Sequence, residues 1–230
     1  MTKKEPYRIL DGTTLKIIAM ISMVFDHAGD LLFPGRPWMR FIGRIALPIF
    51  AFCVAEGYIH TRNKPKYLQR LCLFGLISEL PYDLARSGRL EFDQQNIMLT
   101  FAMAVLALML FDRITAGKKS VWRMIAGIAV TAAIGILAVF LRLESNLFTI
   151  ILILIFYIFR QKAHWLRCLA GFIWHMAMRN MGIYLWGMLS FIPLLMYNGK
   201  KGKGLKWFFY AFYPGHLLLL YLIRTFVLHQ

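Results

Sequence analysis

The stretch Met124-IAGIAVTAAIGILAVF-Leu141 carries no charged residue and indicates the class of the protein. As a helix rising about 1.5 Å per residue, it is long enough to cross a bilayer's hydrocarbon core, which is about 30 Å thick. The whole chain agrees: 59% of its 230 residues are hydrophobic and 17% are charged, with a mean hydropathy of +0.58. A soluble core of this size cannot bury so much apolar surface, so we expect an all-α, polytopic membrane protein.

The apolar segments divide the chain into a short polar start and one membrane domain. Residues 1–12 show no cleavable signal peptide and are expected to lie in the cytoplasm, while residues 13–230 form a single transmembrane helical domain. About nine spans are predicted; eight or ten remain possible, because one span is short and a polar run interrupts 163–198. The predicted spans are 13–33, 41–60, 67–85, 96–112, 122–142, 147–160, 163–179, 184–198 and 205–228.

The formal charge of +16 is distributed unevenly over the two sides of these spans. With the N-terminus in the cytoplasm, 18 of the 27 basic residues fall on the cytoplasmic side, and no lysine falls in an outer loop. The eighteen are Lys3, Lys4, Arg8, Arg62, Lys64, Lys66, Arg70, Arg113, Lys118, Lys119, Arg123, Arg160, Lys162, Arg167, Lys200, Lys201, Lys203 and Lys206. This pattern follows the positive-inside rule, so we expect membrane lipids and no nucleic acid among the partners.

An ionisable pair, Asp26 and His27, lies inside the first apolar segment. Such residues are costly in hydrocarbon unless they face a packed interior or a water-filled cavity, so they indicate a functional site. A polar contact that locks helices together is the alternative. Lys16 lies about three turns, or about 16 Å, before His27, so both side chains project from nearly the same stripe of the helix. Asp30 lies one turn from Asp26 on a neighbouring stripe.

Other polar residues are expected near the ends of later spans. His216 follows Pro214 and Gly215, which are expected to break the last span. Those near the span ends are Arg40, Arg44, Glu56, His60, Glu79, Asp83, Asn96, His175 and Arg179. Ion pairs of Arg40 or Arg44 with Glu79 or Asp83, and a surface pair of Glu56 with His60, are the structural alternatives to a functional role. The three cysteines lack metal-ligand spacing, and no metal is expected.

Five stretches resemble the TraX family: Leu10-DGTTLKIIAMISMVFDHAGD-Leu31, Lys206-WFFYAFYPGHLLLLYL-Ile223, 42–64, 67–86 and 95–102. That family is typified by a membrane protein that acetylates the N-terminus of conjugative pilin. It is similar in turn to transmembrane acyltransferases of the acyltransferase-three and heparan-glucosaminide acetyltransferase type. In those enzymes ten residues separate a basic residue from a histidine in the first helix, as they separate Lys16 from His27. The resemblance implies an acyltransferase of the bacterial cytoplasmic membrane, with acetyl-CoA as co-substrate.

Roles for the candidates follow from this resemblance and from the needs of acyl transfer. His27 is the expected base, oriented by Asp26 or better by Asp30, and His216 is a second proton-handling or oxyanion-stabilising group. Lys16 is expected to contact CoA, which would enter from the basic cytoplasmic loops. Arg40 and Arg44 are further candidates for CoA contacts, and the acceptor is expected to meet Glu56, Glu79, Asp83, Asn96, His175 and Arg179.

Several readings stay open from the sequence. The acyl acceptor could be an amine or a hydroxyl, on a protein N-terminus, a sugar or a lipid. A proton-coupled small-molecule transporter would also place histidines and charged residues at mid-membrane, beside a helix broken at Pro214, although no inverted repeat is visible. An inactive scaffold of a secretion assembly is a third possibility.

Overall fold

The computed structural model describes residues 6–117 and 120–228, and within them it is built from helices with no β-sheet. The all-α prediction is confirmed for this part of the chain. Lys3, Lys4, Lys118 and Lys119, which were assigned to the cytoplasmic side, lie outside the described residues. The α-helices are α1 Gly12–Leu31, α2 Pro37–Gly43, α3 Ala46–His60, α4 Lys64–Ser87, α5 Ile97–Thr115, α6 Val121–Phe140, α7 Asn146–Ile158, α8 His164–Met178, α9 Phe191–Leu195 and α10 Lys206–Leu222. The 3-10 segments are η1 Phe159–Gln161 and η2 Gly182–Ser190, and a π-helical turn, η3 Ile223–Val227, follows α10.

Helical segments match the predicted spans, but not all are regular membrane-length helices. Span 41–60 is divided between α2 and α3, and span 184–198 is a 3-10 segment followed by the short α9. Three helices of the described chain are long and apolar enough to cross a bilayer: Pro37–His60, Ile97–Thr115 and Val121–Phe140. Asn146–Gln161 and Gly182–Leu195 are shorter apolar helices. These helices support a membrane protein, and the count of nine spans stays a prediction.

The last helix does not break where the sequence predicted. α10 continues through Pro214 and Gly215 to Leu222, so the expected interruption before His216 is wrong. A proline inside a helix removes one backbone donor but can be tolerated in a membrane helix where neighbouring groups compensate. His216 is therefore held at a fixed height on a continuous helix.

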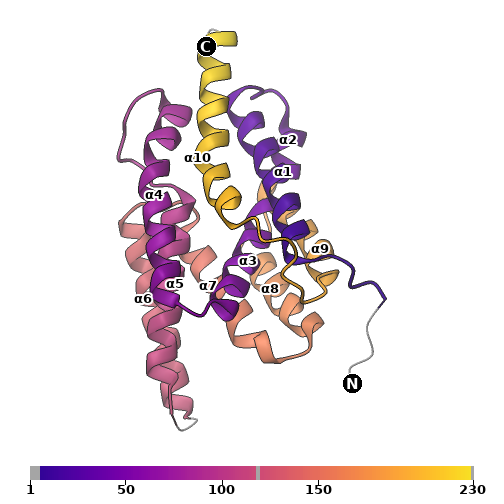
Figure 1. Ribbon diagram of the computed structural model, residues 1–230, viewed down its shortest axis with the longest axis vertical. Coiled ribbons are helices and arrows are strands. Elements are labelled where there is room, and N and C mark those ends of the chain that lie inside the picture. The colour runs from indigo at the N-terminus through magenta and orange to yellow at the C-terminus, as the bar shows by residue number, and fades with distance from the viewer. Residues whose placement is uncertain (1–5, 118–119, 229–230) are drawn as a thin grey trace.

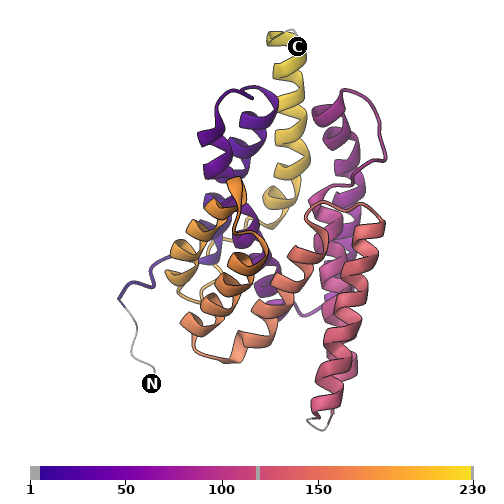
Figure 2. The same ribbon diagram turned by 180° about the vertical axis from the view of Figure 1, so that it is seen from behind.

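The loops gather at two ends of an elongated bundle (Figures 1 and 2). In Figure 1 the connections α3–α4, α5–α6 and α7–α8 lie towards the bottom, and the connections α1–α2 and α4–α5 lie towards the top with the C-terminal end. The turn between α6 and α7 is different, because it lies part-way along the long axis in both views. The connection that leads into α10 also lies part-way along the molecule in Figure 1. The loops are therefore not all divided between two ends, and their sidedness stays a prediction.

The start of α1 is tied to the lysine-rich loop that precedes α10. Asp11 caps the helix by accepting the backbone N–H of Thr14 at 2.8 Å, and this hydrogen bond lowers the pKa of Asp11. The Gly12 N–H donates to the Lys200 carbonyl at 2.8 Å, and the Thr13 hydroxyl donates to the Lys203 carbonyl at 2.7 Å. These contacts bring the cations of that loop beside the first turns of α1.

Candidate functional site

Two histidines from opposite ends of the sequence meet at the contact between α1 and α10. Nδ1 of His27 lies 2.8 Å from Nε2 of His216, and the two rings are nearly parallel, with centroids 5.0 Å apart and planes within 8° of each other. The ring of Phe212 stacks on His216, with centroids 4.7 Å apart. The expectation that both histidines belong to one site agrees with this arrangement, although the sequence did not pair them.

Hydrogen bonding assigns the tautomers of this pair. Nδ1 of His216 lies 2.9 Å from the carbonyl oxygen of Phe212, which only accepts, so this nitrogen carries the proton. In the neutral ring Nε2 of His216 must then accept, and Nδ1–H of His27 donates to it. Nε2 of His27 is left with its lone pair. His27 is thus prepared to take a proton at one defined atom.

His27 lines a small polar cavity of about 50 Å³. Residues from α1, α2, α8 and the turn between α6 and α7 line it, among them Asp26, His27, Arg44, Glu144, His175 and Arg179. Three of their polar atoms are buried and have no hydrogen-bond partner among the described residues: Arg44 Nε, Glu144 Oε2 and His175 Nδ1. Buried polar atoms are normally satisfied, so such a concentration indicates a site rather than a packed core.

The acids next to His27 do not orient it. Asp26 accepts a hydrogen bond from Arg40 Nε at 3.2 Å and forms an ion pair with Arg44, whose Nη2 lies 3.1 Å away, and Asp30 accepts a hydrogen bond from Arg40. The prediction that Asp30 or Asp26 orients His27 is wrong, because α2 packs on α1 and its arginines take both carboxylates. Ion pairing does occur here, but with different partners from the predicted Glu79 and Asp83.

A glycine makes the contact between α1 and α2 possible. A Cβ atom on Gly43 would lie 2.2 Å from the Cβ of Asp26, which is closer than nonbonded carbons approach. The absence of a side chain lets α2 lie against α1 at the level of the site. Arg44 follows directly and is aimed at Asp26.

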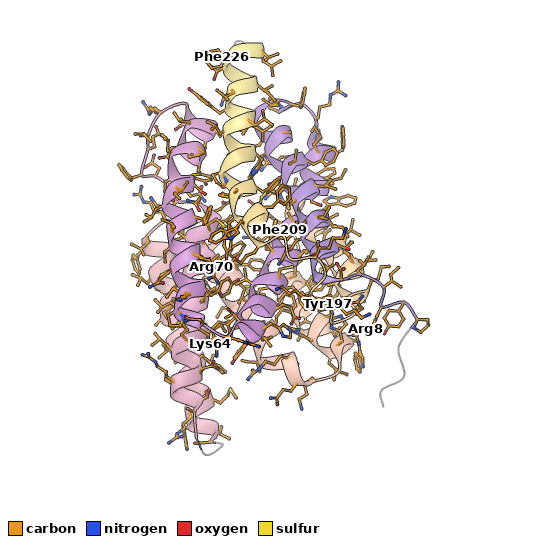
Figure 3. All side chains as sticks on the ribbon, viewed as in Figure 1. Arg8, Lys64, Arg70, Tyr197, Phe209 and Phe226 are labelled. Carbon is orange, nitrogen blue, oxygen red and sulfur yellow. The ribbon has the colours of Figure 1, made fainter. Side chains whose placement is uncertain are left out.

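A second and larger cavity of about 530 Å³ opens on the other side of the same region. Its interior is largely aromatic and aliphatic, with Phe50, Phe52, Leu71, Met98, Phe101 and Phe212 among the lining residues. Cations from three segments also line it: Lys16, Arg62, Arg70, Lys201, Lys203 and Lys206. Its size is that of a small-molecule or cofactor pocket. Figure 3 shows Arg70 of α4 and Phe209 of α10, two of its lining residues.

The two cavities adjoin. Four residues, Met23, Phe50, Ile97 and Phe101, line both of them. The site therefore has two parts. His27 lies in the small cavity, the chamber, and the larger cavity is apolar with several cations in its lining. The four shared apolar side chains lie between the two as an apolar layer. A substrate group that crossed this layer would arrive beside His27.

Lys16 and Glu56 both lie in the larger cavity. Lys16 Nζ sits 4.8 Å from the ring centroid of Phe209, well away from the ion pairs of α2. Glu56 makes the predicted contact with His60, at 3.4 Å, but it also accepts from Arg167 at 2.6 Å and from the Tyr197 hydroxyl at 2.8 Å. Glu56 is thus a half-buried carboxylate with several partners rather than a surface residue.

Three acceptor candidates lie outside both cavities. The side-chain amide of Asn96 donates to Glu79 at 2.6 Å, and its oxygen caps α5 by accepting the Met98 N–H. Asp83 accepts the backbone N–H of Glu91 at 3.2 Å. The expectation that these three residues contact an acceptor finds no support in their positions, because each one fixes the start of α5 or the loop before it. His175 and Arg179, in contrast, do line the small cavity.

The sequence analysis missed Glu144 and misplaced Arg167. Glu144 was expected in an outer loop between two spans, yet it lines the chamber of His27. Arg167 was counted among cytoplasmic cations, but α8 buries it to 6% exposure, with Nε donating to the Phe156 carbonyl. Neither residue carries a sequence signal. Glu144 reaches the chamber only because its turn lies inward in the folded chain, and Arg167 is buried only where it contacts the Phe156 carbonyl.

One of the three cysteines, Cys53, is among the residues that line the larger cavity. Cys53 and Cys168 are buried and Cys72 is half-buried, all as free thiols. In residues 6–117 and 120–228, no group of three or more histidine, cysteine, aspartate or glutamate side chains is arranged to hold a metal ion.

Comparison with known proteins gives the family. The model of a family described as TraX protein matches residues 11–224, nearly the whole chain. The chain belongs to the TraX family. The matched range includes both histidines of the pair, on α1 and α10.

Individual relatives agree with that assignment. A probable fimbrial assembly protein FimC of serogroup H1 from Dichelobacter nodosus is 31% identical over 242 aligned residues, covering 93% of this chain and 95% of the relative. Protein TraX of Escherichia coli is 29% identical over 122 residues, 53% of this chain and 46% of its own length. The aligned part thus spans about half of that TraX protein. No solved structure matches the chain.

Proposed function

We propose that this TraX-family protein is an integral-membrane acyltransferase, which transfers an acetyl group from acetyl-CoA to an acceptor amine or hydroxyl. The observation that carries the proposal is the histidine pair beside two adjoining cavities of different chemistry. The larger cavity suits CoA: its cations match the phosphates, and its apolar interior matches the acyl-bearing arm. The small chamber then receives the acceptor, next to a base.

The geometry supports a defined proton path. Nε2 of His27 takes a proton from the acceptor while its Nδ1–H stays hydrogen-bonded to His216, which stabilises the charge that develops on the ring. The acceptor attacks the thioester carbonyl carbon, and Arg44 Nε is placed to stabilise the tetrahedral oxyanion. The C–S bond breaks, the departing sulfur takes the proton held by His27, and CoA leaves as the free thiol on its own side of the apolar layer.

This arrangement also suggests a sidedness. We place the enzyme in the bacterial cytoplasmic membrane with its N-terminus inside, so that the cationic cavity faces the acetyl-CoA pool. The acceptor, a protein N-terminus, sugar or lipid, then meets the chamber from the outer half, and CoA itself never crosses. Because one relative is named a probable fimbrial assembly protein, a fimbrial subunit is a candidate acceptor, and the family resemblance adds the N-terminus of a pilin.

Release of free CoA thiol from purified protein tests the proposal. Wild-type protein in detergent, given acetyl-CoA and an acceptor, should release CoA, and His27→Ala should lower the rate by about 100-fold or more, the usual worth of a general base. Gel filtration and thermal unfolding should show that the variant folds. If more than a tenth of the wild-type rate remains, His27 is not the base. Proton-coupled uptake into proteoliposomes without CoA release would identify a transporter instead.

A further inference from the structure

The turn between α6 and α7 places Glu144 between two residues with left-handed backbone. Arg142 and Ser145 both have left-handed backbone, with φ of 54° and 52°, although neither is glycine. Residues without glycine's freedom persist in this conformation only where the surrounding structure holds them, and such strain gathers at functional sites. Glu144 lies between them.

The backbone of Glu144 is fixed on both sides. Its N–H donates to the Gln95 carbonyl at 2.9 Å, and its carbonyl accepts from the Thr100 hydroxyl at 2.7 Å. The Gln95 N–H donates in return to the Arg142 carbonyl at 3.1 Å. The turn is therefore clamped to the start of α5, and the clamp keeps it part-way along the molecule rather than at its end (Figures 1 and 2).

The side chain of Glu144 differs from two other half-buried carboxylates, Asp26 and Glu56. Asp26 is paired with Arg40 and Arg44, and Glu56 accepts from Arg167 and Tyr197, whereas the Oε2 atom of Glu144 is buried with no hydrogen-bond partner in the described chain. A buried carboxylate oxygen without a donor is destabilising. It lines the same chamber as His27, where a ligand can supply that donor.

The unpartnered atoms of the residues that line the chamber select the kind of ligand. Arg44 Nε donates, and in the proposed reaction it serves the oxyanion, whereas Nε2 of His27 and Oε2 of Glu144 accept hydrogen bonds. The acceptor group must therefore bring a separate proton to each of these two atoms. A hydroxyl group has one proton, while a primary ammonium has three and a complementary positive charge. Arg44 is paired with Asp26, and the Arg179 guanidinium lies over the rings of Phe148 and Tyr184, at 4.2 and 4.9 Å.

We propose that Glu144 is the residue that recognises the acceptor, holding a primary ammonium group in the small chamber beside His27. The inference rests on the proposed acyltransferase function and assigns the residue that recognises the acceptor. The bound ammonium gives one proton to His27 Nε2, and its nitrogen attacks the thioester carbonyl carbon. The C–S bond breaks, and the departing sulfur takes the proton from His27, which then accepts the second proton from the new amide nitrogen.

Steady-state kinetics of Glu144→Gln test this assignment, because glutamine keeps the shape and loses the charge. The acceptor probe is a short peptide with a free N-terminal amine, and the same peptide with an acetylated N-terminus is the blank. We expect KM for the peptide to rise by at least about tenfold, with KM for acetyl-CoA changed less than about twofold. Asp93→Asn is the matched control: it removes an exposed carboxylate that pairs with Arg142, outside the chamber.

An unchanged peptide KM in Glu144→Gln, or an equal rise in Asp93→Asn, would overturn the assignment. If the peptide binds more tightly to Glu144→Gln than to wild type, an anionic group of the peptide contacts Arg179 instead, and this result would also overturn the assignment. If the glutamine variant does not fold, Glu144→Asp replaces it, and there an unaltered peptide KM counts against the proposal. Titration of wild-type protein with the peptide alone measures amine recognition without turnover. If the peptide amine binds in a way that depends on Glu144 but no CoA is released, the proposed acyltransferase function is wrong while the role of Glu144 in amine recognition stands.

Discussion

At the scale of single residues, a chain of two hydrogen bonds determines which nitrogen of His27 is free to accept a proton. The Phe212 carbonyl fixes the proton on His216, His216 fixes the proton on His27, and His27 is left with one free lone pair. A lone histidine in an apolar helix can present either nitrogen to a substrate. Because His216 is itself fixed by the Phe212 carbonyl, the hydrogen-bonded pair presents only Nε2 of His27 to a substrate. In the proposed reaction His216 is therefore a positioning residue.

Replacement of His216 by alanine should slow turnover without weakening substrate binding. His216 lines neither cavity, so KM for acetyl-CoA and for the acceptor should both stay within about twofold. The turnover number should fall by about 10- to 100-fold, the usual effect of losing a group that orients another, and less than for His27→Ala. Initial-rate kinetics with each substrate varied will measure both. A large rise in either KM with turnover retained would contradict the positioning role.

At the scale of elements, the packing of α2 on α1 decides which acids are available to His27. Gly43 allows the contact, and the arginines on either side of it then take Asp26 and Asp30. A side chain at position 43 would force the helices apart, and Arg44 would lose its place in the chamber.

The variant Gly43→Ala should therefore lose both stability and activity. Its Cβ would meet Asp26 at 2.2 Å, and overpacking of this kind costs about 1–3 kcal/mol. The midpoint of thermal unfolding in detergent should fall below that of wild type. Gly35→Ala is the control, because a Cβ there meets nothing within 4 Å. Equal midpoints for the two variants would show that the α1–α2 contact is not tight.

The sequence predicted the helices well because their hydrophobic runs and polar ends are local features. It predicted both histidines and Lys16 as site residues, since charge inside an apolar helix is visible along the chain. It did not predict their partners. His27 and His216 are 189 positions apart, and only the packing of α1 on α10 joins them. Glu144 was missed because a span boundary normally lies at the surface, and its turn is drawn inward.

At the scale of the whole molecule, the proposed function assigns the donor and the acceptor to two adjoining cavities. Cations from the start of α1, the α3–α4 region and the loop before α10 line the larger cavity, while the chamber lies beyond the apolar layer. Acetyl-CoA with its phosphates would thus be held by charge at one side, and the acceptor by Glu144 at the other. The two binding events should respond differently to salt.

Lys16→Ala should weaken the binding of acetyl-CoA in a salt-dependent way. Removing one cation from a cavity that holds several should lower affinity by a few-fold to about tenfold at low salt, because a contact between charges is partly screened even there. The loss should shrink as ionic strength rises towards 1 M, where the screening length is about 3 Å. Isothermal titration with a non-hydrolysable acetyl-CoA analogue at two salt concentrations measures it.

The control for this experiment is Lys162→Ala, which removes an exposed cation near the α7–α8 connection that lines neither cavity. It should leave the affinity for the analogue unchanged at both salt concentrations. Equal losses for the two variants would mean that only the net charge of this end attracts the donor. If Glu144→Gln loses affinity for the analogue while Lys16→Ala keeps it, the donor occupies the chamber. The assignment of donor and acceptor to the two cavities would then be wrong.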